Sequence, residues 1–324
     1  MPDEDPEPGH GSSSQASAYG GPGWTPRPFG HREEIGNLWG ACGIDSEWRA
    51  LRAVLLHRPG EELAASADPD AVQMLAPLDI GQAQAEHDAL AAAYEAAGVT
   101  VHRLEPEGIP RPNQMFCADL LFMTPEGAIL ARPASMVRAG EERQVARRLA
   151  ALGIPIVRTL RGTATFEGAD ALWLDPKTVL IGCGLRTNAD GAMQVAQALE
   201  AMGVAAIVVD LPYGTMHLMG ILRIVDRELA LAWPRRLAVA AVEALMDRGY
   251  GVAFLPDETD RRESRALNLV ALGPRRVLMP AGHPEIQAFY ESHGIACRAV
   301  AVSELSKAAG AVGCLTGVLQ RESA

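Results

Sequence analysis

Hydrophobic and polar positions follow a pattern that recurs five times along the chain. In each unit an amphipathic helix runs into a glycine and then into a short, β-branched strand. The glycine stands where the end of a helix commonly needs a residue with positive φ. Successive glycines are 55, 50, 46 and 45 residues apart, at Gly98, Gly153, Gly203, Gly249 and Gly294. A period of about 50 residues predicts a repeat architecture.

Short apolar segments precede each helix, and most of them come in close pairs. Examples are ALWLD followed by TVLIG, and ILRIV followed by LALAW. The predicted unit is therefore strand, strand, helix, strand. Five such units favour a closed α/β propeller, with strands inside and helices outside. A doubly wound α/β sheet also alternates strands and helices. The paired strands and the nearly constant unit length favour the five-bladed form.

The N-terminal residues differ from the rest of the chain in composition. Residues 3–30 are dominated by Gly, Ser, Pro, Asp and Glu. Such a segment buries too little apolar surface to offset the entropy of ordering it. We predict a disordered or loosely ordered tail over residues 1–40 and a single α/β-propeller domain over residues 41–324.

The charge and the cysteine content limit the class of protein. The net charge is −11 and no cluster of Lys and Arg stands out, which disfavours nucleic acid as a partner. No apolar run reaches about 18 residues, so we expect no membrane span. An acidic N-terminus without an apolar segment indicates no secretory signal. The five cysteines show no metal-ligand spacing. We therefore expect a reduced, cytoplasmic protein.

A cysteine and a histidine stand at corresponding places in their units. Cys314 follows the last repeat in SKAAGAVGCLTGVLQR, where small residues leave a thiol open to a planar substrate. His217 opens the fourth repeat in YGTMHLMGILRIV. By itself, each residue is more often part of a packed core. Brought together in space, a thiol and an imidazole form an activated nucleophile.

Carboxylates and arginines supply candidate groups for substrate binding. Glu167 and Asp170, in ATFEGADALWL, could form a turn or could bind guanidinium nitrogens by charge-assisted hydrogen bonds. Arg186 follows a strand in VLIGCGLRTNADG, and Arg138 occupies the equivalent turn one unit earlier. An arginine at such a turn can bind a substrate carboxylate through two hydrogen bonds. The Gly-x-Gly beside Arg186 lacks the third glycine of a dinucleotide site.

In combination, these segments resemble the guanidine-modifying superfamily of arginine deiminases, dimethylarginine dimethylaminohydrolases and amidinotransferases. PNQMFCADLLF resembles the F-x-R-D segment, FEGAD the E-G-G-D motif and VLIGCGLRTN the G-x-R-T-N segment; MHLMG and GCLTGVLQR resemble the histidine and nucleophile segments. The resemblance runs from about Cys42 to Glu322. It implies a five-bladed α/β propeller, the pentein fold, and adds Asp119 and Asn113 to the substrate-binding residues. It also implies a small guanidino or ureido substrate and leaves a homodimer open.

Two departures bear on the activity. Ala118 replaces the arginine of F-x-R-D, and Met219 replaces the aspartate of the H-x-D found in deiminases. The second departure favours the dimethylarginine-hydrolase type. The resemblance implies that Glu167 and Asp170 hold the substrate cation, that Cys314 forms a thiouronium and that His217 serves as acid and base. The mechanism that the resemblance implies requires no metal and no organic cofactor. We predict a C–N hydrolase, with an amidinotransferase and a non-catalytic binding protein as alternatives. We also expect Glu141 to be exposed.

Overall fold

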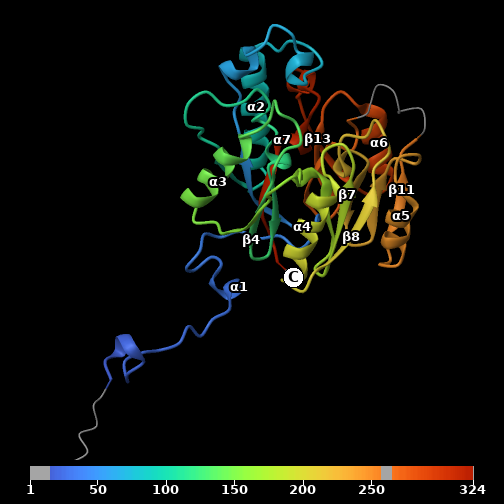
Figure 1. Cartoon of the computed structure of the whole chain (residues 1–324). Helices are drawn as coiled ribbons and strands as arrows, with labels where there is room; N and C mark the ends of the chain where they lie inside the picture. The colour runs from blue at the N-terminus through green and yellow to red at the C-terminus, as the bar shows by residue number, and fades with distance from the viewer. Residues whose placement is uncertain (1–14, 257–264, 324) are drawn as a thin grey trace, which may run out of the picture.

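The computed structural model describes residues 15–256 and 265–323. The chain folds into five three-stranded sheets (Figure 1); four are each built from one sequence repeat, and the other combines strands from the two ends of the fold. In every sheet the middle strand pairs antiparallel with one neighbour and parallel with the other. The predicted mixed α/β class and the strand, strand, helix, strand unit are confirmed.

The sheets have the strand orders β15-β1-β2, β3-β4-β5, β6-β7-β8, β9-β10-β11 and β12-β13-β14. The strands are β1 (Leu51–Leu56), β2 (Thr100–Arg103), β3 (Leu121–Thr124), β4 (Gly127–Leu130), β5 (Ile156–Thr159), β6 (Ala171–Asp175), β7 (Thr178–Cys183), β8 (Ala205–Asp210), β9 (Leu222–Asp226), β10 (Leu229–Ala232), β11 (Gly251–Phe254), β12 (Val270–Gly273), β13 (Arg276–Pro280), β14 (Ala296–Val300) and β15 (Gly317–Arg321). The first sheet thus joins the beginning and the end of the fold, because β15 pairs with β1.

One main helix connects the middle strand of each sheet to its parallel neighbour. These helices are α2 (Ile80–Glu95), α3 (Glu141–Ala151), α4 (Ala189–Glu200), α5 (Val239–Met246) and α6 (Pro284–Ser292); the short helices are α1 (His31–Glu34) and α7 (Val312–Leu315). The glycine after each main helix has φ between 69° and 79°, as its place at a helix end predicts. The helices α2, α3, α5 and α6 lie outside the sheets (Figure 1).

The described part of the N-terminal segment changes character along its length. Residues 15–30 are nearly all exposed and extend away from the sheets (Figure 1). Residues 31–40 contact the sheets: Arg32 Nε donates to Glu126 Oε1 at 2.8 Å, and the Gly40 amide donates to the Gly153 carbonyl. Residues 1–14 of the predicted tail lie outside the described residues. The division into a tail and one domain stays a prediction.

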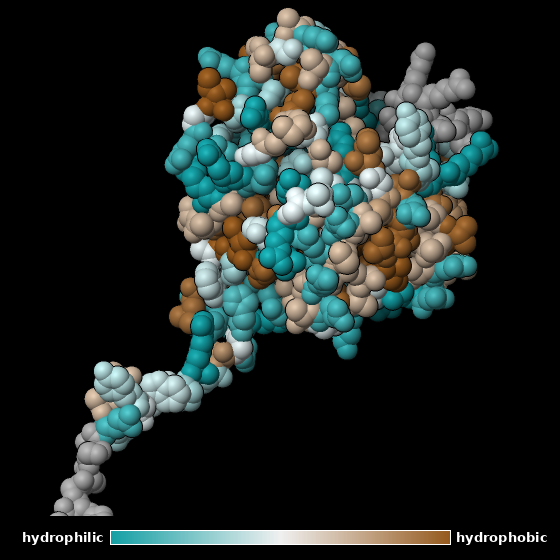
Figure 2. Space-filling model, viewed as in Figure 1, coloured by the Kyte–Doolittle hydropathy of each residue, from teal (hydrophilic) through white to brown (hydrophobic). Residues whose placement is uncertain are grey.

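The apolar side chains on the surface and the lengths of the helices bear on whether a segment could span a membrane. Figure 2 shows apolar side chains in separate groups among hydrophilic ones on the viewed face. Within residues 15–256 and 265–323, no helix has the length and apolar character needed to cross a membrane.

Candidate active site

The functional side chains lie in the turns that lead into the first strand of each sheet. Asp119 precedes β3, Glu167 precedes β6, His217 precedes β9 and Cys314 precedes β15. Because the five units share one architecture, these turns occupy equivalent places in their sheets. The repeat therefore brings together residues that are far apart in the sequence.

Two cavities meet at Cys314. The first is lined by Asn113, Asp119, Arg138, Arg186 and Cys314. The second, of about 250 Å³, is lined by His217, Thr215, Asn268 and Cys314, among others. Cys314, Met216 and Ala309 line both. The thiol therefore has a charged cavity on one side and a cavity that reaches the imidazole on the other.

Glu167 is fully buried and bound by three cationic side chains. Its Oε2 lies 2.7 Å from His217 Nε2 and accepts from Arg138 Nη1 at 3.3 Å. Arg186 Nη1 donates to both carboxylate oxygens, at 3.3 and 3.4 Å. Glu167 lines neither cavity. Its carboxylate therefore fixes the imidazole and two guanidinium groups.

Asp119 retains one carboxylate oxygen without a hydrogen-bond partner. Its Oδ2 accepts from Arg138 Nη1 at 2.6 Å. Its Oδ1 has no partner among the described residues and lies 3.9 Å from His217 Nδ1. An unpaired carboxylate oxygen that is buried costs free energy unless a donor reaches it. Because Asp119 lines the same cavity as Cys314, that donor can come from a bound cation.

These contacts set the protonation of His217 and Glu167. Burial lowers the pKa of His217, but the charges of Asp119 and Asp170 and the hydrogen bond and charge of Glu167 outweigh it and raise the pKa to about 9. Burial raises the pKa of Glu167, but His217, Arg138 and Arg186 lower it to about 2. At neutral pH His217 is thus an imidazolium whose Nε2–H is donated to a carboxylate.

The Cys314 thiol is buried and held by an asparagine. Asn268 Nδ2 lies 2.9 Å from Cys314 Sγ, and Asn268 Oδ1 accepts from the Cys314 amide at 3.0 Å. Burial and the charge of Asp119 raise the pKa of the thiol, while Asn268 and the charge of Arg223 oppose the rise. Cys314 is therefore a thiol at neutral pH until a further positive charge enters the site.

Two expectations are corrected. Asp170 is fully buried, accepts from Thr187 Oγ1 at 2.7 Å and from the Leu218 amide at 2.9 Å, and lines neither cavity. Its carboxylate holds the turn that bears His217 and does not face a substrate. Glu141 is fully buried and pairs with Arg138 at 2.8 Å, so the expected exposure is wrong. Its place in the first turn of α3 directs it inward.

The sequence analysis did not identify Asn268 as a site residue. It lies in the turn before β12, the first strand of its sheet. Asp119, Glu167 and His217 occupy the equivalent turns of their own sheets. The signal that finds it is the repeat itself, since four of the five equivalent turns bear site residues.

Asn113 lines the first cavity and donates from Nδ2 to the Val72 carbonyl at 2.8 Å. None of the other four cysteines lines either cavity.

Three side chains lie close enough together to be considered as ligands of a metal ion. Ligand atoms of Asp119, Glu167 and His217 lie within 4.8 Å of one another. Arg138 and Arg186 already bind these carboxylates, and like charges would repel a metal cation there. The two carboxylates are better suited to hold the His217 imidazole in one orientation.

Comparison with known proteins identifies the family. The model of the family described as N,N dimethylarginine dimethylhydrolase, eukaryotic, matches residues 75–253, more than half of the 324 residues. The chain belongs to this family. It is also similar to the N(G),N(G)-dimethylarginine dimethylaminohydrolase of Pseudomonas aeruginosa, with 28% identity over 238 residues, covering 74% of this chain and 89% of that protein.

Solved structures agree with this assignment. A dimethylarginine dimethylaminohydrolase variant that carries an adduct with S-methyl-L-thiocitrulline has a TM-score of 0.69 and 25% identity, and covers 84% of this chain and all of that chain. The amidinotransferase SxtG of Microseira wollei, with a TM-score of 0.70 and 15% identity over 87% and 98% of the two chains, shares the fold. The resemblance to the guanidine-modifying superfamily is confirmed, and the chain is a guanidino C–N hydrolase of this dimethylhydrolase family.

Proposed function

We propose that this protein hydrolyses the guanidinium C–N bond of a substituted arginine, releasing an alkylamine and the ureido product, citrulline. The observation that carries this proposal is the first cavity, which holds the Cys314 thiol together with the unpaired Oδ1 of Asp119. A guanidinium placed there donates to Asp119 and presents its planar carbon to sulfur. The name of the Pseudomonas aeruginosa relative supports dimethylarginine as the substrate.

The reaction begins when the bound substrate changes the protonation state of the Cys314 thiol. The bound guanidinium adds a positive charge, which lowers the thiol pKa, so that the thiol loses its proton to solvent water and becomes a thiolate. The Cys314 sulfur attacks the guanidinium carbon. His217, protonated at neutral pH, gives a proton from Nδ1 to the departing amine, because its Nε2 is held by Glu167. The product of this half-reaction is a thiouronium on sulfur.

Water completes the reaction. After losing its proton, His217 accepts one from a water molecule that attacks the thiouronium carbon. The carbon–sulfur bond then breaks, giving the ureido product and the Cys314 thiolate. The second cavity supports hydrolysis, because it gives water a path to both His217 and Cys314. An amidinotransferase would need to exclude water from this position.

The two arginines have different roles in this proposal. Arg138 is bound by Asp119, Glu141 and Glu167, so we assign it to holding these carboxylates. Arg186 contacts Glu167 through Nη1 alone among the described hydrogen bonds and lines the first cavity. Its remaining donors are suited to the substrate α-carboxylate. Asn113, which lines the same cavity, is suited to a polar contact with the substrate.

The closed five-bladed propeller over residues 41–324 belongs to this proposal. It is supported by contacts between β15 and β3, between β9 and β12 and between β12 and β1. The cysteines of the described residues are free thiols, which supports the cytoplasmic location. The homodimer rests on the resemblance alone, and the molar mass by light scattering tests it.

Product analysis tests the function. We expect incubation with asymmetric dimethylarginine alone to yield dimethylamine and citrulline in equal amounts, detected by mass spectrometry. The Cys314→Ser variant, with Cys297→Ser as the matched control, shows whether turnover belongs to this thiol. Product that forms only after an acceptor amine such as glycine is added would replace the hydrolase with an amidinotransferase. No reaction with any guanidino compound would contradict both.

A further inference from the structure

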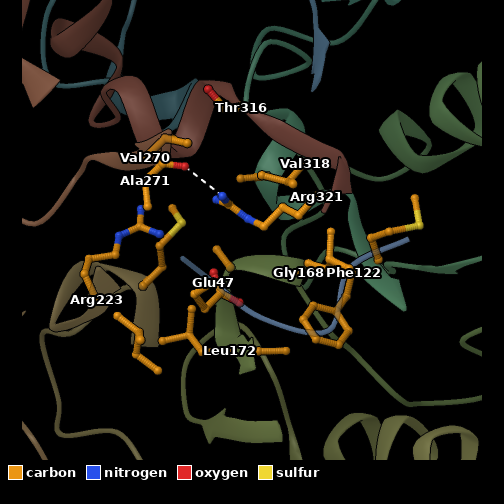
Figure 3. A pocket seen from close by; sticks show the side chains of 18 of the residues that line it. Glu47, Phe122, Gly168, Leu172, Arg223, Val270, Ala271, Thr316, Val318 and Arg321 are labelled. Atoms are coloured by element: carbon orange, nitrogen blue, oxygen red, sulfur yellow. Dashed lines mark hydrogen bonds between the residues drawn. The ribbon is translucent and has the colours of Figure 1, made fainter. Parts of the chain in front are cut away.

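A separate cavity of about 70 Å³ lies next to the nucleophile segment (Figure 3). Residues from the first strand of all five sheets line it, and Gly313 and Thr316 line it on either side of Cys314 in the sequence. It shares no residue with the cavity that holds Asp119. A single water molecule needs about 10–15 Å³, so the cavity has room for a small ion and its nearest waters.

Two buried arginines point into this cavity. Figure 3 shows Arg223 and Arg321 entering from opposite sides, with Glu47 between them. Arg223 is 8% exposed and Arg321 is 4% exposed. Arg223 Nε donates to the Leu267 carbonyl at 2.8 Å, and Arg321 Nη1 donates to the carbonyls of Arg49 and Ala271. These bonds fix both guanidinium groups and leave other donors directed inward.

The remaining donors have no acceptor in the described part of the chain. Arg223 Nη2 and Arg321 Nε are buried and lack hydrogen-bond partners among residues 15–256 and 265–323. A buried donor without an acceptor is costly, and more so when it is charged. The site therefore favours a ligand that accepts hydrogen bonds from two sides.

The charges at the cavity do not cancel. Arg223 and Arg321 contribute two positive charges, and Glu47, whose Oε1 accepts from the Trp173 amide at 3.0 Å, contributes at most one negative charge. Burial lowers the pKa of Arg321 to about 10; the charge of Glu47 opposes this fall, and the charge of Arg223 adds to it. The two guanidinium groups thus repel each other in a low-dielectric space. One monovalent anion between them would balance the charge.

A second hollow lies beside the cavity. A larger space of about 690 Å³ shares Ile44 and Arg321 with the cavity. Its wall includes the cations Arg32, Arg52 and Lys177 and the carboxylates Asp45 and Glu322, and Arg52 Nη2 lies 3.5 Å from Glu322 Oε1. With Arg321, cations outnumber carboxylates on this wall, which favours the approach of an anion although the chain as a whole carries a net charge of −11.

We propose that the cavity between Arg223 and Arg321 is a binding site for a small monovalent anion of halide size. The ligand accepts the Nη2–H of Arg223 and the Nε–H of Arg321 and neutralises the excess charge. The single excess charge and the volume of about 70 Å³ favour a small monovalent anion over a larger or polyvalent one.

The anion site lies next to the nucleophile through Gly313. A Cβ atom at Gly313 would lie 2.1 Å from Arg223 Nη2, so only glycine allows the guanidinium to approach the backbone this closely. The charge of Arg223 lowers the pKa of the Cys314 thiol. An anion that shares this charge makes the thiolate less favourable and slows the enzyme. This link to activity rests on the proposed role of Cys314, whereas occupancy of the site does not.

Bromide tests occupancy directly. In crystals of the full chain grown in excess sodium bromide, we expect an anomalous peak between Arg223 and Arg321. In solution, chloride should raise the melting temperature by about 2–4 °C over gluconate at equal ionic strength, because gluconate is too large to enter. Arg223→Gln and Arg321→Gln should abolish this difference. Arg52→Gln, an exposed charge on the wall of the second hollow, should preserve it.

The thiol gives an independent readout. Chloride should slow alkylation of Cys314 by iodoacetamide about threefold relative to gluconate, as a rise of half a pKa unit predicts. A cavity that holds only water in bromide crystals, with no bromide peak, overturns the proposal even if both arginine variants fail to fold. Equal melting temperatures in chloride and gluconate overturn it as well. A bromide peak in a protein that fails to hydrolyse any guanidine would refute the proposed function alone.

Discussion

The carboxylate of Glu167 should control the acidity of His217. Replacing it by Glu167→Gln keeps the shape of the side chain and its ability to accept a hydrogen bond, but removes its negative charge. Glu167 Oε2 lies 2.7 Å from His217 Nε2. The variant therefore stabilises the imidazolium less, and the pKa of His217 should fall.

The size of this fall follows from the interactions of the imidazole. The rise of the His217 pKa from 6.5 to about 9 corresponds to about 3 kcal/mol in favour of the imidazolium. Glu167 provides a hydrogen bond and a charge, while Asp119 and Asp170 provide two more charges. Assigning roughly a third to a half of the effect to Glu167 gives a fall of about one pKa unit, or about 1.4 kcal/mol.

The pH dependence of kcat measures this change. His217 must be protonated to release the amine, so kcat should fall as the pH rises through the His217 pKa. We expect the alkaline limb to lie near pH 9 in the wild type and roughly one unit lower in Glu167→Gln. NMR titration of histidine ring protons reports the same pKa independently. Glu105→Gln, which removes an exposed carboxylate, serves as the matched control.

An unchanged alkaline limb and an unchanged histidine titration in folded Glu167→Gln would refute this reasoning. Folding must be verified, because Arg138 and Arg186 also lose a charged partner. Removing one partner from a buried ion pair costs about 3–5 kcal/mol. Arg138 keeps Asp119 and Glu141, so we expect a loss near or below the lower end of that range, measured by chemical denaturation.

Three further predictions follow from the same geometry. Cys314→Ser should lose essentially all turnover but still bind substrate, as calorimetry can show, whereas Cys117→Ser should keep measurable activity. Asp119→Asn should lower kcat/KM at least tenfold, since a charge-assisted hydrogen bond contributes about 1.5–3 kcal/mol; equal kinetics in Asp119→Asn and wild type would remove Asp119 from the substrate site. The pKa of His217 is raised on folding, so the contribution of its protonated form to stability is complete below pH 6.5 and is lost as the pH rises through about 9. The difference in unfolding free energy between wild type and His217→Gln should therefore shrink between these pH values. A constant difference would contradict the raised pKa.

The repeat pattern predicted the fold because local rules produce it. A helix that ends at glycine and continues into an apolar strand is determined by neighbouring residues, and the five glycines have the expected positive φ. The pairing of β1 with β15 is different. It joins segments far apart in the sequence, and no local pattern in either segment specifies its partner.

The candidate site was likewise only partly predictable from the sequence. The identities of Cys314, His217 and Glu167 followed from the residues and the family resemblance, but their roles depend on which atoms face one another. Protein partners hold the carboxylates of both Glu167 and Asp170. The residue that lines the first cavity and has a carboxylate oxygen without a partner among the described residues is Asp119. Asn268 is an ordinary polar residue in its local sequence, and it is distinguished by its equivalent place in the fifth unit and by its contact with the Cys314 sulfur.

The pairing of β15 with β1 has a consequence during synthesis of the protein on the ribosome. Cys314 lies three residues before β15, which is the last of the described strands to be made. The histidine and the carboxylates emerge earlier, but the sulfur reaches them only after the first sheet receives its final strand. A nascent or truncated chain therefore has no assembled catalytic centre. Enzymatic activity itself reports that synthesis has passed β15 and that this strand has joined the first sheet.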